Sequence, residues 1–361
     1  MNRAAELLAE LVAIPTHQAG PDGIAGDERR ICEHLAPLLR DRGAEEVVVA
    51  GAPRTDGSPG AYVFARWGTP RRIINAHVDT VPANAGWSRD PWTPHVEGDK
   101  LYGLGSADTK GAIAATLVAL DAERPRDVGV LFSGDEEAGS RVMHAFLASP
   151  HAREVREAIV CEPTARIAGV AHRGVLGQAA TLEGEGGHSS KADVMPKPLV
   201  QLARLAVALD ELGRGRLHDG PPGMTGTCLN VAALHGGVAF NVIPQRGKLE
   251  WSLRPYPGFD RARWDADVAA AARAIDPAIT LVSGVEHAPF ACDKLAAVVR
   301  PFVDRIGALD FWTEAALYEE HGIDAIVVGP GDIGRAHAAD EFVTLEDLDW
   351  AVELYRALLA G

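Results

Sequence analysis

Five residues of this chain have the side chains of metal ligands and stand at the ends of predicted strands or just before a predicted helix. Two are histidines and three are carboxylates: His77, Asp108, Glu137, Glu162 and His337. In an open α/β sheet, ligands bind at the edge where the strands have their carboxyl ends. Side chains that are far apart in the chain can therefore converge there. Imidazole nitrogens and carboxylate oxygens together suit Zn²⁺ best, with Co²⁺ or Mn²⁺ as workable substitutes.

Chemistry assigns different roles to these ligands. A site with two metal ions, about 3.5–4 Å apart, needs one carboxylate that bridges them. Asp108 has a short side chain at a helix start and is the natural bridge. His77 and Glu162 can complete one metal site, and Glu137 and His337 the other. We therefore predict two divalent metal ions, with Zn²⁺ favoured and Co²⁺ as the alternative.

Two more acidic residues stand beside these ligands. Glu136 is left without a metal ion, and an unligated carboxylate at such a site is what a general base needs. Asp79 lies two residues after His77, on the same side of an extended segment. It can accept the ring N–H of His77 and fix the tautomer. Each residue alone also fits an ordinary structural role, as Asp108 fits a helix N-cap, so the prediction depends on the combination.

Composition restricts the class of protein. A length of 361 residues favours two domains. The net charge of −15 argues against nucleic acid or an anionic membrane as a partner. No apolar run is long enough to span a bilayer, and the first residues lack the pattern of a signal peptide. We therefore expect a cytoplasmic protein. The four cysteines are far apart, so neither a disulfide framework nor a cysteine-zinc site is expected.

The chain outside its middle third has the pattern of an α/β domain. Several apolar runs are apolar on both faces, as in a sheet that is covered by helices on each side. The predicted strands are 47–49, 62–65, 73–76, 128–132, 158–161 and 325–328, and the predicted helices are 4–14, 27–40, 111–121, 140–148 and 345–359. We assign this catalytic, metal-binding domain to residues 1–172 and 290–361.

The middle of the chain has a different order of elements. Strand, helix, strand, strand, helix and strand are predicted in turn, which is the ferredoxin-like unit. Their ranges are 175–182, 198–212, 229–234, 248–253, 261–275 and 279–282. We therefore predict that residues 173–289 form an α+β domain inserted into the α/β domain.

The motifs around the candidate ligands resemble one known family. They are His77-Val78-Asp79-Thr80-Val81-Pro82, 103–111, 133–139, 161–164 and the block around His337. The chain is similar, essentially end to end, to the acetylornithine deacetylase / succinyl-diaminopimelate desuccinylase family, which includes aminoacylases and carboxypeptidases. The resemblance implies a mixed-sheet domain of the dizinc aminopeptidase/carboxypeptidase kind with an inserted lid. It also implies two zinc or cobalt ions in the roles given above and a cis peptide between Asp108 and Thr109.

The resemblance further implies roles in and near the lid. It implies a homodimer formed through the lid, with His188 reaching a neighbouring active site to stabilise the oxyanion. Arg254 and Asn241 match residues that hold the substrate carboxylate, for which arginine has a suitable bidentate geometry. The loop of Gly329 and Gly331 is expected to offer backbone N–H groups near the substrate.

The segments 311–315, 329–333 and 340–343 look like the arginine-pathway branch, and are especially similar to enzymes that act on acetylcitrulline. The expected reaction removes acetate from N-acetyl-L-citrulline or N2-acetyl-L-ornithine. Glu314 is the candidate partner for an ornithine side chain. A desuccinylase needs an extra cation, for which Arg173 and Lys110 exist, and a dipeptidase is also open. A non-catalytic binding protein on the same fold is the remaining alternative.

Overall fold

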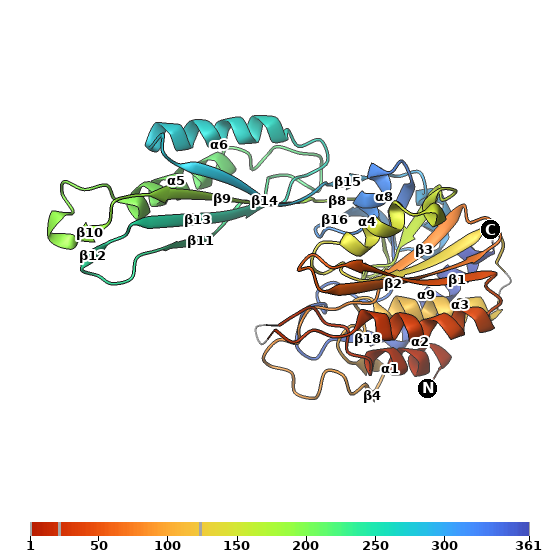
Figure 1. Ribbon diagram of the computed structural model, residues 1–361. Helices are drawn as coiled ribbons and strands as arrows, with labels where there is room; N and C mark the ends of the chain where they lie inside the picture. The colour runs from red at the N-terminus through yellow and green to blue at the C-terminus, as the bar shows by residue number, and fades with distance from the viewer. Residues whose placement is uncertain (1, 21–22, 123–124, 361) are drawn as a thin grey trace. The chain divides into compact units, whose positions relative to one another are not determined.

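The computed structural model describes residues 2–20, 23–122 and 125–360 and divides the chain into two compact units (Figure 1). Unit 1 comprises Met1–Val170, Cys292–Leu309 and Thr313–Gly361, and unit 2 comprises Ala171–Ala291 and Asp310–Trp312. The two main boundaries lie two residues from the predicted ones. The short segment Asp310–Trp312 belongs to unit 2, which sequence patterning did not indicate.

A mixed sheet forms the centre of unit 1, in the order β1-β2-β6-β3-β7-β17-β8 (Figure 1). The strands are β1 (Glu46–Pro53), β2 (Pro59–Trp67), β3 (Arg72–His77), β6 (Val128–Ser133), β7 (Glu157–Val160), β8 (Ile167–His172) and β17 (Asp324–Val327). β6, β3, β7 and β17 run parallel to one another, and the other pairs are antiparallel. β3 and β6 are buried almost throughout, as expected for strands covered on both faces. The predicted α/β class with a mixed sheet is confirmed.

Helices cover both faces of this sheet, and the alternation of side chains along β2 shows how. Val63 and Ala65 point into the core that the sheet shares with α1, α2, α3 and α9. Phe64 and Tyr62 point the other way and contact Phe146 of α4, with ring centroids 5.4 and 5.7 Å apart. The helices are α1 (Arg3–Val12), α2 (Glu28–Asp41), α3 (Lys110–Ala122), α4 (Arg141–Leu147), α7 (Ala296–Val299), α8 (Ala315–Glu320) and α9 (Leu345–Leu359).

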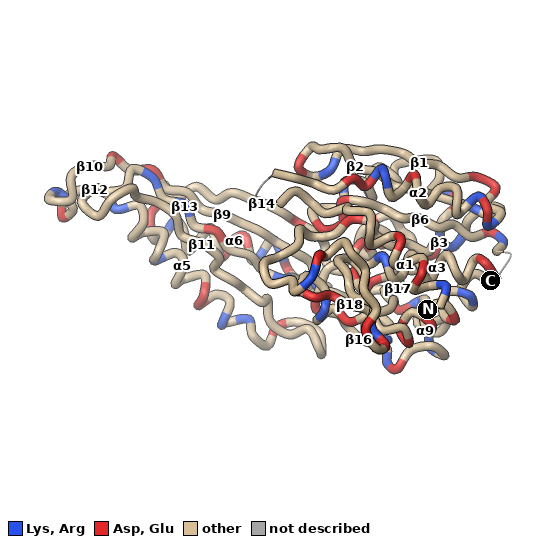
Figure 2. The backbone as a smooth tube through the Cα atoms, turned by 90° about the horizontal axis from the view of Figure 1, so that it is seen from below, with Lys and Arg blue, Asp and Glu red and all other residues tan. Residues whose placement is uncertain are grey.

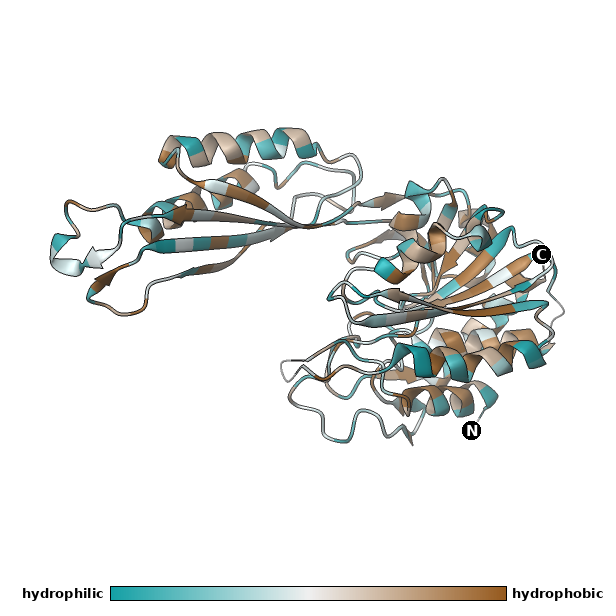
Figure 3. Ribbon diagram, viewed as in Figure 1, coloured by the Kyte–Doolittle hydropathy of each residue, from teal (hydrophilic) through white to brown (hydrophobic). Residues whose placement is uncertain are grey.

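The hydropathy of the chain follows these layers. Figure 3 shows apolar strands in the sheet of unit 1 and polar residues on the outer sides of its helices. α3 is buried nearly all round, because it packs against both α1 and α9. Residues with capping side chains set where two of the surrounding helices begin: Asp27 caps α2 and Thr344 caps α9.

Unit 2 contains a four-stranded antiparallel sheet with two helices. In chain order the elements are β9 (Val175–Glu183), α5 (Pro198–Arg214), β11 (Asn230–Gly236), β13 (Arg246–Leu253), α6 (Arg261–Ile275) and β14 (Thr280–His287). The strand order is β11-β13-β9-β14, so the predicted β-α-β-β-α-β order is the one found. Trp251 and Trp264 both donate their indole N–H to the side-chain oxygen of Gln178, at 3.1 and 2.8 Å, which satisfies polar groups at the edge of this core.

Sequence patterning gave no prediction for β8, α7 and α8, nor for a further set of short elements. They are β4 (His95–Glu97), β5 (Lys100–Tyr102), β10 (Gly187–His188), β12 (Val242–Ile243), β15 (Phe290–Ala291), β16 (Arg305–Leu309), β18 (Phe342–Thr344) and the 3₁₀ turns at 150–152, 189–191 and 300–302. Elements this short show no periodicity, and they form through pairing with distant segments, as β18 pairs with β5. Among the helices that the structure describes, none has both the length and the apolar character needed to cross a membrane.

Candidate metal centre

The parallel strands of unit 1 bring the predicted ligands to one edge of the sheet. His77 is the last residue of β3, Glu137 follows the end of β6 by four residues, and Glu162 follows the end of β7 by two. Asp108 lies two residues before α3, and His337 lies in the long segment between β17 and β18. Since β3, β6, β7 and β17 are parallel, their carboxyl ends lie at the same edge.

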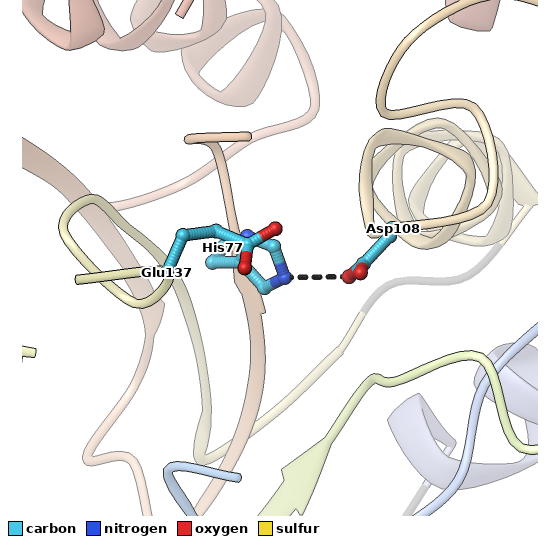
Figure 4. Close-up of side chains that lie close together, drawn as sticks. All are labelled: His77, Asp108 and Glu137. Carbon is cyan, nitrogen blue, oxygen red and sulfur yellow. Dashed lines mark hydrogen bonds and ion pairs between the residues drawn. The ribbon is translucent and has the colours of Figure 1, made fainter. Parts of the chain in front are cut away.

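Asp108 lies at the centre of the cluster and faces both histidines. Its Oδ1 is 2.9 Å from His77 Nε2, and its Oδ2 is 3.4 Å from His337 Nε2. His337 Nε2 is also 2.9 Å from Glu137 Oε2, and His77 Nε2 is 3.9 Å from Glu162 Oε2. Figure 4 shows His77, Asp108 and Glu137 directed toward one another, and their ligand atoms lie within 4.8 Å of each other. The structure therefore brings all five predicted ligands together.

Two backbone features accompany this geometry. The peptide between Asp108 and Thr109 is cis, as the resemblance implied. His337 has a φ of 59°, in the left-handed region that residues other than glycine seldom adopt.

The electrostatics of the cluster call for additional positive charge. With only protein groups present, burial raises the pKa values of Glu136 and Glu162 well above the usual range. The charge of Glu162 adds to the effect on Glu136, and that of Asp108 to the effect on Glu162. Burial and the charge of Asp108 also raise the pKa of Glu137. A bound cation would favour ionisation of all these carboxyl groups.

The pKa values of the two histidines are also raised, because the surrounding carboxylates favour a positive charge on each imidazole. Hydrogen bonds to Asp108 and Glu137 raise the pKa of His337 to about 10. Burial opposes the charged form of His77, but Asp108 and Asp79 outweigh it and hold its pKa well above the usual value. A divalent cation would take the place of these protons, because a histidine binds metal through a neutral nitrogen. The donor set therefore fits a metal ion.

Glu136 differs from the ligands around it. Its backbone N–H donates to Asp79 Oδ1 at 3.1 Å, but its carboxylate forms no hydrogen bond or ion pair with any residue that the structure describes. Glu136 is half-buried, and it lies close enough to Glu162 and His77 for their charges to shift its pKa.

Asp79 holds the backbone of the neighbouring turn. Its two carboxylate oxygens accept N–H groups from Glu136 and Glu137, each at 3.1 Å, and Oδ2 also accepts the amide of Gln18 at 2.7 Å. The Nδ1 of His77 is 2.9 Å from the carbonyl oxygen of Asp79 and 3.6 Å from its carboxylate. The carbonyl is thus the nearer acceptor for the His77 ring, where we expected the carboxylate, because three other N–H groups occupy that carboxylate.

Three residues of unit 1 were predicted to contact the substrate: Glu314, Gly329 and Gly331. Their surroundings differ. Glu314 is 1% exposed and accepts the hydroxyl of Ser133 at 2.9 Å, and burial raises its pKa to about 7. Such enclosure argues against direct contact with a substrate side chain. Gly329 donates its N–H to Thr164 Oγ1 at 3.3 Å. Gly331, with a φ of 90°, lies so close to Ala107 that a Cβ there would be 3.1 Å from the alanine methyl.

The three predicted residues of unit 2 do not all lie together. His188 and Asn241 are neighbours, because β10 pairs with β12 and the N–H of Ser189 donates to the Asn241 carbonyl at 3.0 Å. Arg254 follows the other end of β13, and eight residues of extended strand separate the two places by about 26 Å. Figure 1 shows β10 and β12 at one extremity of this unit. His188, Asn241 and Arg254 are all exposed.

Two buried glutamates that hold the ligand loops were missed by sequence analysis. Glu341 accepts backbone N–H groups from the loop that carries Asp108. Glu28, paired with Arg54 at 2.8 Å, accepts the N–H groups of Ala61 and Asp135, at 3.0 and 3.1 Å. Glu28 is the first residue of α2, where an acidic residue is common, and Glu341 lies in the block around His337. The sequence therefore offered no separate signal for either of them.

The fold and the site together define a class: a hydrolase of amide bonds built on a mixed sheet between helices, with a candidate metal site at the carboxyl edge of that sheet. Residues 73–361 match peptidase family M20/M25/M40, and the chain belongs to this family. The predicted family resemblance is thereby confirmed.

Two named relatives are similar in sequence to this chain over most of its length. It is 35% identical over 320 residues to N-acetyl-L-citrulline deacetylase of Xanthomonas campestris pv. campestris, covering 84% of this chain and 86% of that protein. It is 29% identical to acetylornithine deacetylase of Photorhabdus laumondii subsp. laumondii, covering 94% and 92%.

Solved structures share the fold at lower sequence identity. An M20 family metallo-carboxypeptidase from Sulfolobus solfataricus has a TM-score of 0.79 at 17% identity, covering 100% of this chain and 99% of that one. A Bacillus subtilis protein described as a dinuclear metal binding peptidase of the M20 family has a TM-score of 0.67 at 15% identity, covering 99% and 97%.

Proposed function

We propose that this enzyme removes the acetyl group from an N-acetyl-L-amino acid of arginine biosynthesis, N-acetyl-L-citrulline or N2-acetyl-L-ornithine, and releases acetate. Relatives with these two activities support the substrate class, and the higher identity is to the citrulline enzyme. The observation that carries the reaction type is the ligand cluster around Asp108 with the free carboxylate of Glu136 beside it.

We further propose that the cluster holds two Zn²⁺ ions, with Co²⁺ as a working substitute. Asp108 presents a different oxygen to each histidine, as a bridging ligand would. His77 with Glu162 would hold one ion, and His337 with Glu137 the other. When bound, such ions polarise a carbonyl group and lower the pKa of water.

Side chains of the protein perform the remaining steps. Glu136 accepts a proton from the attacking water and returns it to the α-amine as the amide bond breaks. Asp79 keeps Glu136 in place through the backbone N–H that it accepts. His188 donates to the oxyanion, and Asn241, Arg254 and the N–H of Gly331 bind other parts of the substrate.

A substrate panel tests this assignment. Purified enzyme with Zn²⁺ or Co²⁺ is expected to release acetate from acetylcitrulline and acetylornithine with a kcat/KM at least about 100-fold above that for succinyl-diaminopimelate or dipeptides, because a site that hydrogen-bonds one substrate discriminates strongly against compounds that leave its polar groups unpaired. Acetate release and free amine are measured separately. Faster turnover of succinyl-diaminopimelate or a dipeptide would replace the proposed substrate, and no turnover of any compound would favour a binding protein.

We also propose that the enzyme is a homodimer formed through unit 2, which acts there as a lid. β11 is an edge strand with Val231 and Leu234 exposed, a surface that can pair with another chain. Phe240, next to Asn241, is fully exposed. Because one strand separates Asn241 from Arg254, one small substrate can meet both only if two chains contribute. His188 and Asn241 would then act on the neighbouring chain's substrate.

Mixing two inactive variants tests this arrangement. His188→Ala has an intact metal cluster, and Glu136→Gln has an intact His188. After mixing under conditions that exchange subunits, heterodimers would contain one complete site, and about a quarter of wild-type activity is expected. Each variant alone serves as the control. Absence of recovery despite verified exchange would contradict action in trans, and a monomer in sedimentation would contradict the dimer.

The remaining partners and the location follow from composition. Figure 2 shows Lys and Arg interspersed with Asp and Glu along both units, and the net charge is −15. We therefore propose a small-molecule substrate, with no nucleic-acid or membrane partner, and a cytoplasmic enzyme.

A further inference from the structure

We propose that Glu341 is a positioning residue that fixes the orientation of Asp108 between His77 and His337. This inference rests on the metal site proposed above. It concerns a side chain that touches neither substrate nor metal and that acts through the backbone of another segment.

The carboxylate of Glu341 is enclosed by one loop. Its Oε1 accepts the N–H of Ala107 at 2.8 Å and of Asp108 at 3.1 Å, and its Oε2 accepts the N–H of Gly105 at 2.9 Å. The Glu341 carbonyl accepts the N–H of Gly103 at 3.0 Å. Glu341 is 1% exposed, so water does not compete for these bonds.

Within the part of the chain that the structure describes, Glu341 is the acceptor for the N–H groups of Gly105, Ala107 and Asp108. Residues 103–108 follow β5 and precede α3, outside any strand or helix, and their buried N–H groups need acceptors. One carboxylate supplies two oxygens to three of them. Asp108 donates one of these three N–H groups, and its side chain faces both histidines. The hydrogen bond to Glu341 therefore restricts where the Asp108 side chain can point.

The same segment contributes a ligand of its own. His337 lies four residues before Glu341, and the intervening Asp340 accepts the N–H and hydroxyl of Ser88, each at 3.0 Å. Directly after Glu341, β18 pairs with β5, with Phe342 opposite Tyr102. Segment 337–341 therefore carries one histidine ligand and holds the loop of the bridging carboxylate, so that the two cannot shift independently.

Glu341→Gln is the variant that tests this role. An amide has one acceptor oxygen and turns N–H groups toward a loop that presents only donors there. We expect Co²⁺ affinity to fall by about 10–100-fold, as for other residues that support metal ligands. The visible absorption spectrum of bound Co²⁺ should change, and kcat should fall at saturating Co²⁺ while KM stays within about threefold of wild type, because Glu341 does not contact substrate.

Glu157→Gln is the matched control. Glu157 is a partly buried carboxylate bonded to Arg72 at 2.8 Å, at the amino end of β7, away from the ligand edge. Its Co²⁺ affinity and spectrum should equal those of wild type. Glu341→Asp keeps the charge but reaches fewer of the three N–H groups, so its affinity should lie between those of wild type and Glu341→Gln. If circular dichroism shows that Glu341→Gln is unfolded, Glu341→Asp is used in its place.

The outcomes separate this inference from the proposed function. Wild-type Co²⁺ affinity and spectrum in folded Glu341→Gln, or in Glu341→Asp if the glutamine variant is unfolded, would overturn the positioning role alone. Failure of the wild-type protein to bind Co²⁺ would instead remove the metal site on which both depend.

Discussion

Replacing Glu136 by glutamine is expected to give a folded, metal-loaded protein whose kcat is lower by about 10²–10⁴-fold, the usual contribution of a general base. The substitution keeps the shape of the side chain and removes its ability to accept a proton. Metal should stay bound, because Glu136 takes no part in the short contacts among His77, Asp108, Glu137 and His337. The backbone N–H of residue 136 can still donate to Asp79.

Steady-state kinetics together with metal analysis of the purified variant decide this prediction. Glu353→Gln, at an exposed glutamate that pairs with Arg356, controls for loss of a surface carboxylate. A variant that keeps kcat within a few-fold would exclude Glu136 as the base. A variant that is inactive because it has lost its metal would make Glu136 a ligand.

Removal of metal by a chelator is expected to abolish turnover, and rebinding should become tighter as the pH rises. His337 has a pKa of about 10 among its protein neighbours, so it carries a proton at neutral pH that a metal ion must displace. The pKa values of Glu136 and Glu162 are raised well above the usual range, so a cation that lowers them releases further protons as the pH falls. Each proton released on binding makes the apparent affinity change about tenfold per pH unit, below the pKa of the group concerned.

The direction of this effect is fixed by the protonated groups. At lower pH more ligands hold protons, so Zn²⁺ or Co²⁺ affinity should fall from pH 8 to pH 6. Calorimetric titration in buffers of different ionisation enthalpy measures the number of protons released. In His337→Ala the pH dependence should become shallower. An affinity that is independent of pH over this range would contradict the proposed ligand set.

The main elements of the fold could be predicted because their signals are local. β3 and β6 are continuous apolar runs, and α2 begins at a capping aspartate before a periodic apolar stripe. The candidate ligands His77, Glu137 and Glu162 could be predicted because they lie at or just after the ends of strands, and parallel strands place their carboxyl ends together. Chemistry then separated Glu136, as a candidate base, from the predicted metal ligands.

What could not be predicted depends on three-dimensional packing. Nothing in the sequence distinguishes Glu341 from a solvated acidic residue, because its partners are backbone N–H groups more than 230 positions away. Glu314 has a residue type that suits a cationic substrate, and only the fold shows that it is enclosed beneath Ser133. The distance between Asn241 and Arg254 likewise became visible only once β13 was seen to separate them.

The interruption of unit 1 by unit 2 has a consequence for how the chain is made. β17, at 324–327, lies between β7 and β8 in the central sheet, yet it is synthesised some 150 residues after them. Unit 2 is nearly continuous in the chain and so can fold as soon as it leaves the ribosome, whereas β7 must wait for its neighbour. During that interval β7 presents an open edge, and a nascent chain that stops before residue 337 lacks its second imidazole ligand.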